Sequence, residues 1–333
     1  MEDYIIKDSC FADFMKETVE PFLTQRRKAF RIPREAGKSL YFVRYEAADA
    51  IGTVVISHGF TETAEKYLEV VYYFLKHHYH VYQPEHCGHG RSYRLAEDLS
   101  LVHIDRYERY VRDLLAVAGV AKREHPELPL FLFAHSMGGD IAAAALAAQP
   151  ELFEKAVLSS PMIRPLTGSM SWPVTKLFIN ILCLTGKEKQ YVPGGHPFDG
   201  KERFEDSAAV SRERFEYYQR KRGAQPLYQM NAASCGWLNE MAKLNRFLMR
   251  DGWKRIKTPL YIFQAQSDAF VSGEAQDRFA EKVKRAGKTS VRKACVAGTK
   301  HEIFGSGEQV QRTFWEQVFR FLSGDRTVSG GAE

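Results

Sequence analysis

Cysteine is scarce in this chain, and long apolar runs are missing from it. The 333 residues include five cysteines, at positions 10, 87, 183, 235 and 295, an odd number with no metal-binding spacing. This usage excludes a disulfide framework and predicts reduced thiols in the cytoplasm. No stretch reaches the length of a membrane span, and no apolar leader follows Met1. We therefore expect a cytoplasmic protein that meets a membrane only peripherally, at its inner face.

Signatures of nucleotide, nucleic-acid and metal binding are also missing. The glycine-rich stretch at 85–92 has neither GxGxxG spacing nor the Lys-Ser/Thr pair of a phosphate loop. The net charge of +6 is modest, and the basic clusters at 26–28, 220–222 and 254–257 carry few interleaved aromatic residues. These clusters favour a solvated face or contact with anionic lipid over nucleic-acid binding. The histidines of 77–80 span a predicted helix end and strand start, so their imidazoles diverge, and no metal or other cofactor is expected.

A serine stands where a strand pattern turns into a helix pattern. The apolar residues 131–135 are followed by Ser136 and by an alanine-rich helix pattern over 140–149. Such a turn needs small residues two positions away, and Ala134 and Gly138 provide them. The pattern predicts a nucleophile on a sharp strand-to-helix turn, and the alternative is a serine that only caps a core helix. In the first case, the Met137 N–H is positioned to bind a developing oxyanion.

An acid and a base follow this serine in the chain. Residues 259–265 have the pattern of a buried strand, and Asp268 lies on the loop just past its end. Residues 290–296 form a further strand pattern, and His301 lies on the loop that follows. Because parallel strands end at the same edge of a sheet, we expect the three side chains to meet there. His301 would take the proton from Ser136, and Asp268 would fix the tautomer of the imidazole.

A second oxyanion donor is expected after an earlier strand. Residues 53–57 have the pattern of a central strand that ends in His58, Gly59 and Phe60. Gly59 lets the backbone pass close to a substrate, so the Phe60 N–H is the candidate partner of the Met137 N–H. We interpret His58 as a structural residue that packs beside the oxyanion hole formed by these two N–H groups.

Together these motifs resemble one family. The chain is similar to the α/β-hydrolase serine hydrolases that include lysophospholipases and monoacylglycerol lipases. The similarity covers roughly residues 30–322 and is carried by His58-Gly59, Gly-His-Gly-Arg-Ser at 88–92, the segment 103–113, Ala-His-Ser-Met-Gly-Gly at 134–139, Gly236-Trp237, Asp268 and His301-Glu302. One departure is Glu-His-Cys at 85–87, where related sequences more often carry Asp-x-Arg. The resemblance implies an α/β-hydrolase fold, with a mostly parallel central sheet flanked by helices and an inserted, mainly helical cap.

The segment 163–250 interrupts the alternation of strands and helices and separates the serine from the acid and base. We therefore expect a core built from 1–162 and 251–323, a cap over 163–250 and a frayed tail at 324–333. Residues 172–184 of the cap are apolar almost all round. This pattern has two interpretations. Either both faces of the helix are buried, or the helix contacts an acyl chain through the candidates Trp172, Leu177, Phe178 and Ile181. Residues 202–206 and 212–216 have the alternating charge of exposed helix.

The sequence as a whole predicts a serine esterase without a cofactor, acting on the acyl ester of a lysophospholipid or a monoacylglycerol. Its partners would be this lipid-like ester and, peripherally, a membrane, with no nucleic acid. A proline-iminopeptidase-like aminopeptidase is the alternative enzyme, with Glu188, Glu202 or Glu205 available to hold a substrate amine. A catalytically inactive binding protein is the alternative from another class, and the intact Ser-Asp-His order argues against it. No motif specifies the headgroup, the acyl length or the oligomeric state.

Overall fold

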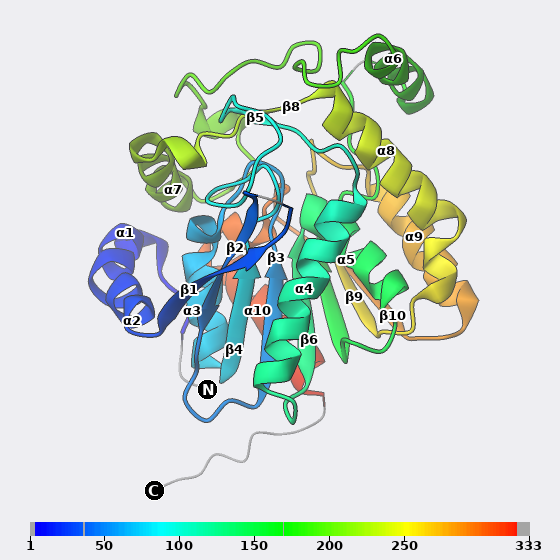
Figure 1. Ribbon diagram of the computed structural model, residues 1–333. Helices are drawn as coiled ribbons and strands as arrows, with labels where there is room; N and C mark the ends of the chain where they lie inside the picture. Colours follow the sequence, from blue (N-terminus) through cyan, green and yellow to red (C-terminus); the bar gives the residue numbers. More distant parts are fainter. Residues whose placement is uncertain (1–3, 36, 169, 325–333) are drawn as a thin grey trace, which may run out of the picture.

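A mostly parallel sheet forms the centre of the molecule. The computed structural model describes residues 4–35, 37–168 and 170–324, and its eight-stranded sheet has the order β1-β2-β4-β3-β6-β7-β9-β10 (Figure 1). Strand β2 pairs antiparallel with β1 and β4, and the neighbours from β4 to β10 pair parallel. The strands are β1 Arg27–Pro33, β2 Ser39–Tyr45, β3 Gly52–Ser57, β4 Tyr79–Pro84, β6 Leu130–His135, β7 Lys155–Ser159, β9 Leu260–Ala265 and β10 Val291–Val296. The predicted fold class is therefore confirmed.

Helices cover both faces of this sheet and enclose two apolar cores. One face packs against α4 Glu108–Glu124, α5 Met137–Ala148, α8 Cys235–Arg250 and α9 Gly273–Ala286. The other packs against α1 Phe11–Phe14, α2 Glu20–Thr24, α3 Leu68–Lys76 and α10 Glu308–Ser323. Because both faces are covered, β3 and β6 are buried along their whole length, which is why they read as continuous apolar runs.

The segment 163–250 lies mainly above the carboxyl ends of the parallel strands (Figure 1). It contains α6 Trp172–Leu184, α7 Arg212–Ala224, α8 and β8 Ala232–Ala233, and β8 pairs with β5 Leu101–Val102 outside the central sheet. Helix α8 also contributes Leu244 and Leu248 to the apolar core that contains α4, α5 and α9. Among the described residues, none of the helices is both long enough and apolar enough to span a lipid bilayer. The tail expected at 324–333 lies, apart from Gly324, outside the described residues.

The two charged stretches of this segment differ from the exposed helices expected of them. Only Phe204–Asp206 of the first stretch is helical, as a single 3₁₀ turn. In α7, Arg214 is buried, because its guanidinium forms ion pairs with Glu69 (2.7 Å) and with Asp8. Partners far away in the chain thus bury a residue whose local pattern indicated solvent exposure.

One carboxyl group of the core has no partner. Asp140 in α5 is 1 % exposed, and within the described structure neither carboxyl oxygen makes a hydrogen bond. Burial raises the pKa of Asp140 well above its usual range. The group is therefore neutral in the folded protein at a pH where it is ionised in the unfolded chain.

We expect Asp140→Asn to raise the melting temperature at about pH 7.5, because the parent loses about 1.4 kcal/mol of unfolding free energy for each pH unit above an unfolded-state pKa of about 3.9. The asparagine does not titrate, so the gain should shrink as the pH falls toward about 4.5. Thermal melts at both pH values measure it, with the exposed Asp13→Asn as the control. An equal gain at the two pH values would show that ionisation of Asp140 is not the cause.

Candidate active site

Ser136 lies on a strained turn between β6 and α5. Its backbone angles are φ 52° and ψ −121°, in a region that residues other than glycine rarely adopt. A Cβ atom at Gly138 would lie 2.2 Å from the Ser57 carbonyl oxygen, and one at Gly139 would lie 2.6 Å from the Pro161 Cβ. The two glycines are therefore required for α5 to start this close to β3 and to the chain after β7. The requirement at Gly138 follows the sequence prediction, whereas the one at Gly139 was missed.

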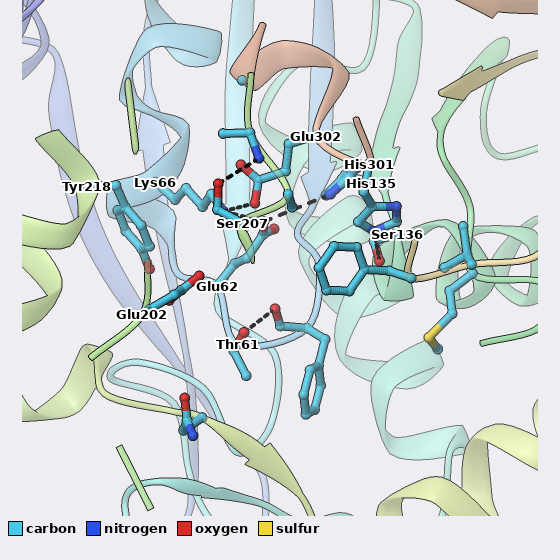
Figure 2. Close-up of a pocket in the computed structure, with 18 of the residues that line it drawn as sticks. Thr61, Glu62, Lys66, His135, Ser136, Glu202, Ser207, Tyr218, His301 and Glu302 are labelled. Carbon is cyan, nitrogen blue, oxygen red and sulfur yellow. Dashed lines mark hydrogen bonds and ion pairs between the residues drawn. The ribbon is translucent and has the colours of Figure 1, made fainter. Parts of the chain in front are cut away.

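The three predicted polar side chains meet in one hydrogen-bonded chain, of which Figure 2 shows Ser136 and His301. Ser136 Oγ donates to His301 Nε2 at 2.8 Å, and His301 Nδ1–H donates to Asp268 Oδ2 at 2.7 Å. The other oxygen of Asp268 accepts the N–H groups of Phe270 and Val271, each at 2.9 Å. Burial alone would raise the pKa of Asp268, but the hydrogen bonds from His301 and from the backbone hold it below its usual range. An ionised Asp268 thus fixes the tautomer in which Nε2 can accept the serine proton.

Two backbone N–H groups beside Ser136 are free to bind an oxyanion. Met137 is the first residue of α5, and Phe60 follows β3; within the described residues neither N–H has an acceptor. The Phe60 loop is folded back by Glu62, whose Oε2 accepts the Gly59 N–H at 2.6 Å. A Cβ atom at Gly59 would lie 2.7 Å from that oxygen and would push the Glu62 carboxylate away from the Gly59 N–H. These two N–H groups are the candidate oxyanion hole.

Buried neutral histidines hold the same loop from the other side. His58 Nδ1–H donates to the Gly59 carbonyl and Nε2 accepts the His86 N–H, both at 2.8 Å. His89 Nε2 accepts the Thr61 N–H at 3.3 Å. Burial lowers the pKa of His58 to about 4 and that of His89 well below its usual range. Both rings therefore stay neutral and keep the acceptor nitrogen that each backbone N–H needs.

A buried ion network joins this loop to the His301 loop. Lys66 pairs with Glu62 at 3.1 Å and also with Glu302, the residue after His301. Burial alone would raise the pKa of Glu62, but Lys66, His135 and the Tyr67 hydroxyl together outweigh it, and the pKa falls to about 2. The ring of His135 lies 4.9 Å from that of His301, and burial lowers the pKa of His135 to about 3. The base thus packs against a neutral ring and lies beside a paired ammonium group.

Ser136 and His301 open into a cavity of about 580 Å³ between the core and segment 163–250. Much of its wall is apolar, formed by Phe60, Met162, Pro165, Leu166, Met170, Phe178, Ile179, Val192, Trp237, Leu238, Phe270, Val271 and Phe304. A cavity of this size with a few polar groups is typical of a small-molecule site.

Helix α6 turns only part of its surface toward this cavity. Of the four residues proposed as acyl contacts, Phe178 lines the cavity, together with the neighbouring Ile179. Trp172, Leu177 and Ile181 lie outside the lining, and Leu177 and Ile181 are 63 % and 49 % exposed. The helical period of 3.6 residues places these two on the outer face, so three of the four assignments were wrong.

Several polar residues of the cavity were not predicted as site residues. Lys66, Tyr218, Arg222 and Glu302 line it, beside Glu202, which the sequence offered only as a carboxylate for the aminopeptidase alternative. They come from three distant segments and share no local motif. Only Glu302 carried a signal, because it follows the predicted base directly.

The histidines of residues 77–80 point to different neighbours. His77 stacks on Phe319 with 3.6 Å between ring centroids, and His80 stacks on His125 at 4.1 Å. In the part of the chain that the structure describes, no group of three or more His, Cys, Asp and Glu side chains has a geometry that could hold a metal ion.

Because the triad acts as a unit, we expect Ser136→Ala and His301→Ala each to lower kcat by roughly 10⁴- to 10⁶-fold, with little further loss in the double variant. Asp268→Asn should also lower kcat severely, but by less than either of these two changes. Ester hydrolysis measures these losses, and the exposed Ser290→Ala serves as the control. A fluorophosphonate should label Ser136 alone; losses that multiply in the double variant, or labelling of Cys87, would contradict the partnership.

Known proteins resemble this chain in sequence and in fold. Lysophospholipase L2 of Escherichia coli (strain K12) is 25% identical over 348 aligned residues, which cover 99% of this chain and 97% of that protein. The monoglyceride lipase of Rattus norvegicus is 36% identical over 110 residues, which cover 33% of this chain and 35% of that one. A soluble variant of monoglyceride lipase from Saccharomyces cerevisiae has the same fold, with a TM-score of 0.68 at 16% identity over 91% of this chain and 96% of that one.

These relatives confirm the family resemblance seen in the motifs. The profile of the family described as serine aminopeptidase, S33, matches residues 48–308 and so includes Ser136, Asp268 and His301. The chain belongs to the serine aminopeptidase S33 family of α/β-hydrolases.

Proposed function

We propose that this protein is a serine esterase that hydrolyses the acyl ester of single-chain glycerolipids. The observation that carries the proposal is the hydrogen-bonded chain of Ser136, His301 and Asp268 at the floor of a cavity with an apolar wall. Relatives named lysophospholipase and monoglyceride lipase support the same substrate class. A protein that only bound lipid would not need a triad in hydrogen-bonding order.

In the proposed mechanism, Ser136 Oγ attacks the ester carbonyl while its proton passes to His301 Nε2. The carbonyl oxygen becomes an oxyanion and is bound by the N–H groups of Phe60 and Met137. When this tetrahedral intermediate collapses, the bond between the acyl carbon and the alcohol oxygen breaks, and the alcohol oxygen takes the proton from His301. A water molecule then gives a proton to His301 and attacks the acyl carbon; the bond to Ser136 Oγ breaks, Oγ takes that proton back from His301, and the fatty acid is released. Asp268 stays ionised and stabilises the imidazolium.

Residues 163–250 form the proposed cap over the acyl chain. The loop before α6 and the inner face of the helix contribute Leu166, Phe178 and Ile179 to the cavity wall. Met162, at the end of the turn after β7, extends the same wall next to Ser136. An acyl chain against these side chains buries apolar surface without placing any polar group in an apolar environment.

The aminopeptidase alternative is not favoured. It needs a cap carboxylate that is free to hold an amine, and none of the three candidates has that position. Glu202 pairs with Arg222, and Glu205 pairs with Arg212 on the surface. Glu188 lies outside the lining of the cavity.

The outer face of α6 is the proposed site of peripheral membrane contact. It exposes Val174, Leu177, Ile181 and Leu184 by 49 to 79 %. Lysines 176, 187 and 189 on and after this helix suit an anionic lipid surface. The basic cluster at 220–222 contributes less than its sequence suggested, because Arg222 is buried and Lys221 pairs with Glu20 at 2.9 Å.

Release of fatty acid tests the proposed activity. We expect turnover of monoacylglycerol or lysophosphatidylcholine and of p-nitrophenyl butyrate, and no turnover of a prolyl or other aminoacyl nitroanilide. Ser136→Ala should abolish ester turnover. Hydrolysis of the nitroanilide without ester hydrolysis would overturn the lipid assignment and favour a peptidase.

Neighbouring residues of α6 separate acyl binding from membrane contact. Phe178→Asp should lower kcat/KM for a long-chain ester by about 10²-fold relative to p-nitrophenyl butyrate, since each methylene that loses its apolar contact costs about 0.8 kcal/mol. Leu177→Asp, on the outer face, should keep the long-to-short ratio for monomeric substrates but weaken binding to phosphatidylglycerol vesicles. Equal loss on both esters in Phe178→Asp, with a lowered melting temperature, would identify that side chain as packing only.

A further inference from the structure

The cavity has two chemically different ends. Helices α6 and α7 lie at opposite ends of the layer above the sheet (Figure 1), and both contribute to the cavity wall. The α6 end supplies apolar side chains, whereas α7 and the chain that precedes α3 supply charged and phenolic groups. In Figure 2, Tyr218, Glu202 and Lys66 lie on the side of the cavity opposite Ser136 and His301. An ester at Ser136 with its acyl chain under α6 therefore directs its alcohol part toward α7.

Among the described residues, each Lys and Arg side chain that lines the cavity already has a carboxylate partner. Lys66 pairs with Glu62 and Glu302, Arg222 with Glu202, and Arg214 with Glu69 and Asp8. Among the described lining residues, five carboxylates, Glu62, Glu65, Glu69, Glu202 and Glu302, face three cations. Burial raises the pKa of Glu302, and with that carboxyl group protonated the remaining carboxylates still outnumber the cations.

The charged groups behind Glu65 are paired as well. Glu65 faces Arg27 at 3.2 Å and Arg91 at 3.4 Å, and Arg91 also pairs with the buried Glu85 at 3.2 Å. Lys221 lies 3.9 Å from Glu65 and pairs with Glu20. A phosphodiester that entered this end of the cavity would meet paired cations and carboxylate oxygens. Its own oxygens accept hydrogen bonds but donate none, so it would lose its hydration without compensation.

A hydroxyl-bearing headgroup fits the same groups. Tyr218 lines the cavity, and its phenol oxygen is buried beside the Thr63 hydroxyl, with no other hydrogen-bond partner among the described residues. Burial raises the pKa of Tyr218 to about 12, so the phenol keeps its proton and can donate to a substrate hydroxyl. A substrate hydroxyl can also donate to a carboxylate oxygen at this end, whereas a phosphate oxygen has no proton to donate.

We propose that this end of the cavity receives the alcohol part of the substrate and selects a neutral polyol headgroup, so that a monoacylglycerol is hydrolysed in preference to a lysophospholipid with the same acyl chain. The inference rests on the proposed esterase function and narrows its substrate class. Glu202 keeps Arg222 neutralised at the rim of the cavity, and Tyr218 supplies the hydrogen bond that favours the polyol.

The test compares headgroups on one acyl chain. The substrates are dodecanoylglycerol, dodecanoyl lysophosphatidylglycerol and dodecanoyl lysophosphatidylcholine, all as monomers, beside p-nitrophenyl butyrate. We expect kcat/KM for dodecanoylglycerol to exceed that for each phospholipid by about tenfold or more. Equal values in the parent would overturn the headgroup inference and leave the esterase intact. Hydrolysis of the butyrate with none of the three lipids would instead overturn the proposed function and this inference with it.

Two variants link the preference to named residues. Glu202→Gln deprives Arg222 of its carboxylate, so the ratio of lysophosphatidylglycerol to dodecanoylglycerol turnover should rise about fivefold or more. Glu205→Gln is the matched control, because this carboxylate pairs with Arg212 on the surface, and it should keep the parent ratio. Tyr218→Phe should lower kcat/KM for dodecanoylglycerol about three- to tenfold and affect the phospholipids less. An unchanged turnover ratio in Glu202→Gln would contradict the role of Glu202. Equal losses on dodecanoylglycerol and the phospholipids in Tyr218→Phe would contradict the role of Tyr218. Thermal melts identify any loss of activity that comes from unfolding.

Discussion

The strained backbone of Ser136 is the constraint on which the catalytic geometry depends. A residue held at φ 52° and ψ −121° costs about 1–3 kcal/mol, so it persists only where its surroundings impose it. Here the Ser136 N–H donates to the Ser159 carbonyl at 3.1 Å, and the Ser136 carbonyl accepts the Met162 N–H at 2.9 Å. Gly138 and Gly139 let α5 start in contact with the adjacent strand ends. The same turn exposes the serine oxygen and leaves the Met137 N–H beside it.

The same sheet edge and a buried ion network fix the positions of the remaining groups of the site. Strands β3, β9 and β10 deliver the Phe60 loop, Asp268 and His301 to the edge at which β6 ends. The Glu62–Lys66–Glu302 network then ties the Phe60 loop to the loop of His301. Removing one partner of such a network leaves an uncompensated buried charge, so the network resists displacement of either loop.

Chemistry and selectivity are divided between two layers of the molecule. The sheet edge carries the reacting groups, whereas segment 163–250 contributes much of the wall of the cavity into which they open. The apolar side chains under α6 suit an acyl chain, and each described cation of the lining near α7 is already paired with a carboxylate. Differences in headgroup preference within this fold can therefore arise without any change at Ser136, Asp268 or His301.

The fold class and the triad were predictable from the sequence because their signals are local. An apolar run that ends at Ser136 before an alanine-rich helix needs no distant partner to be recognised, and Asp268 and His301 each follow a strand pattern directly. The face of α6 was not predictable, because a helix that is apolar all round has no amphipathic pattern to orient it, and packing alone turned Ile179 inward and Leu177 outward. The burial of Arg214 and the pairing of Arg222 with Glu202 depend on partners from remote segments. The charge balance of the cavity therefore follows from three-dimensional contacts that no local pattern encodes.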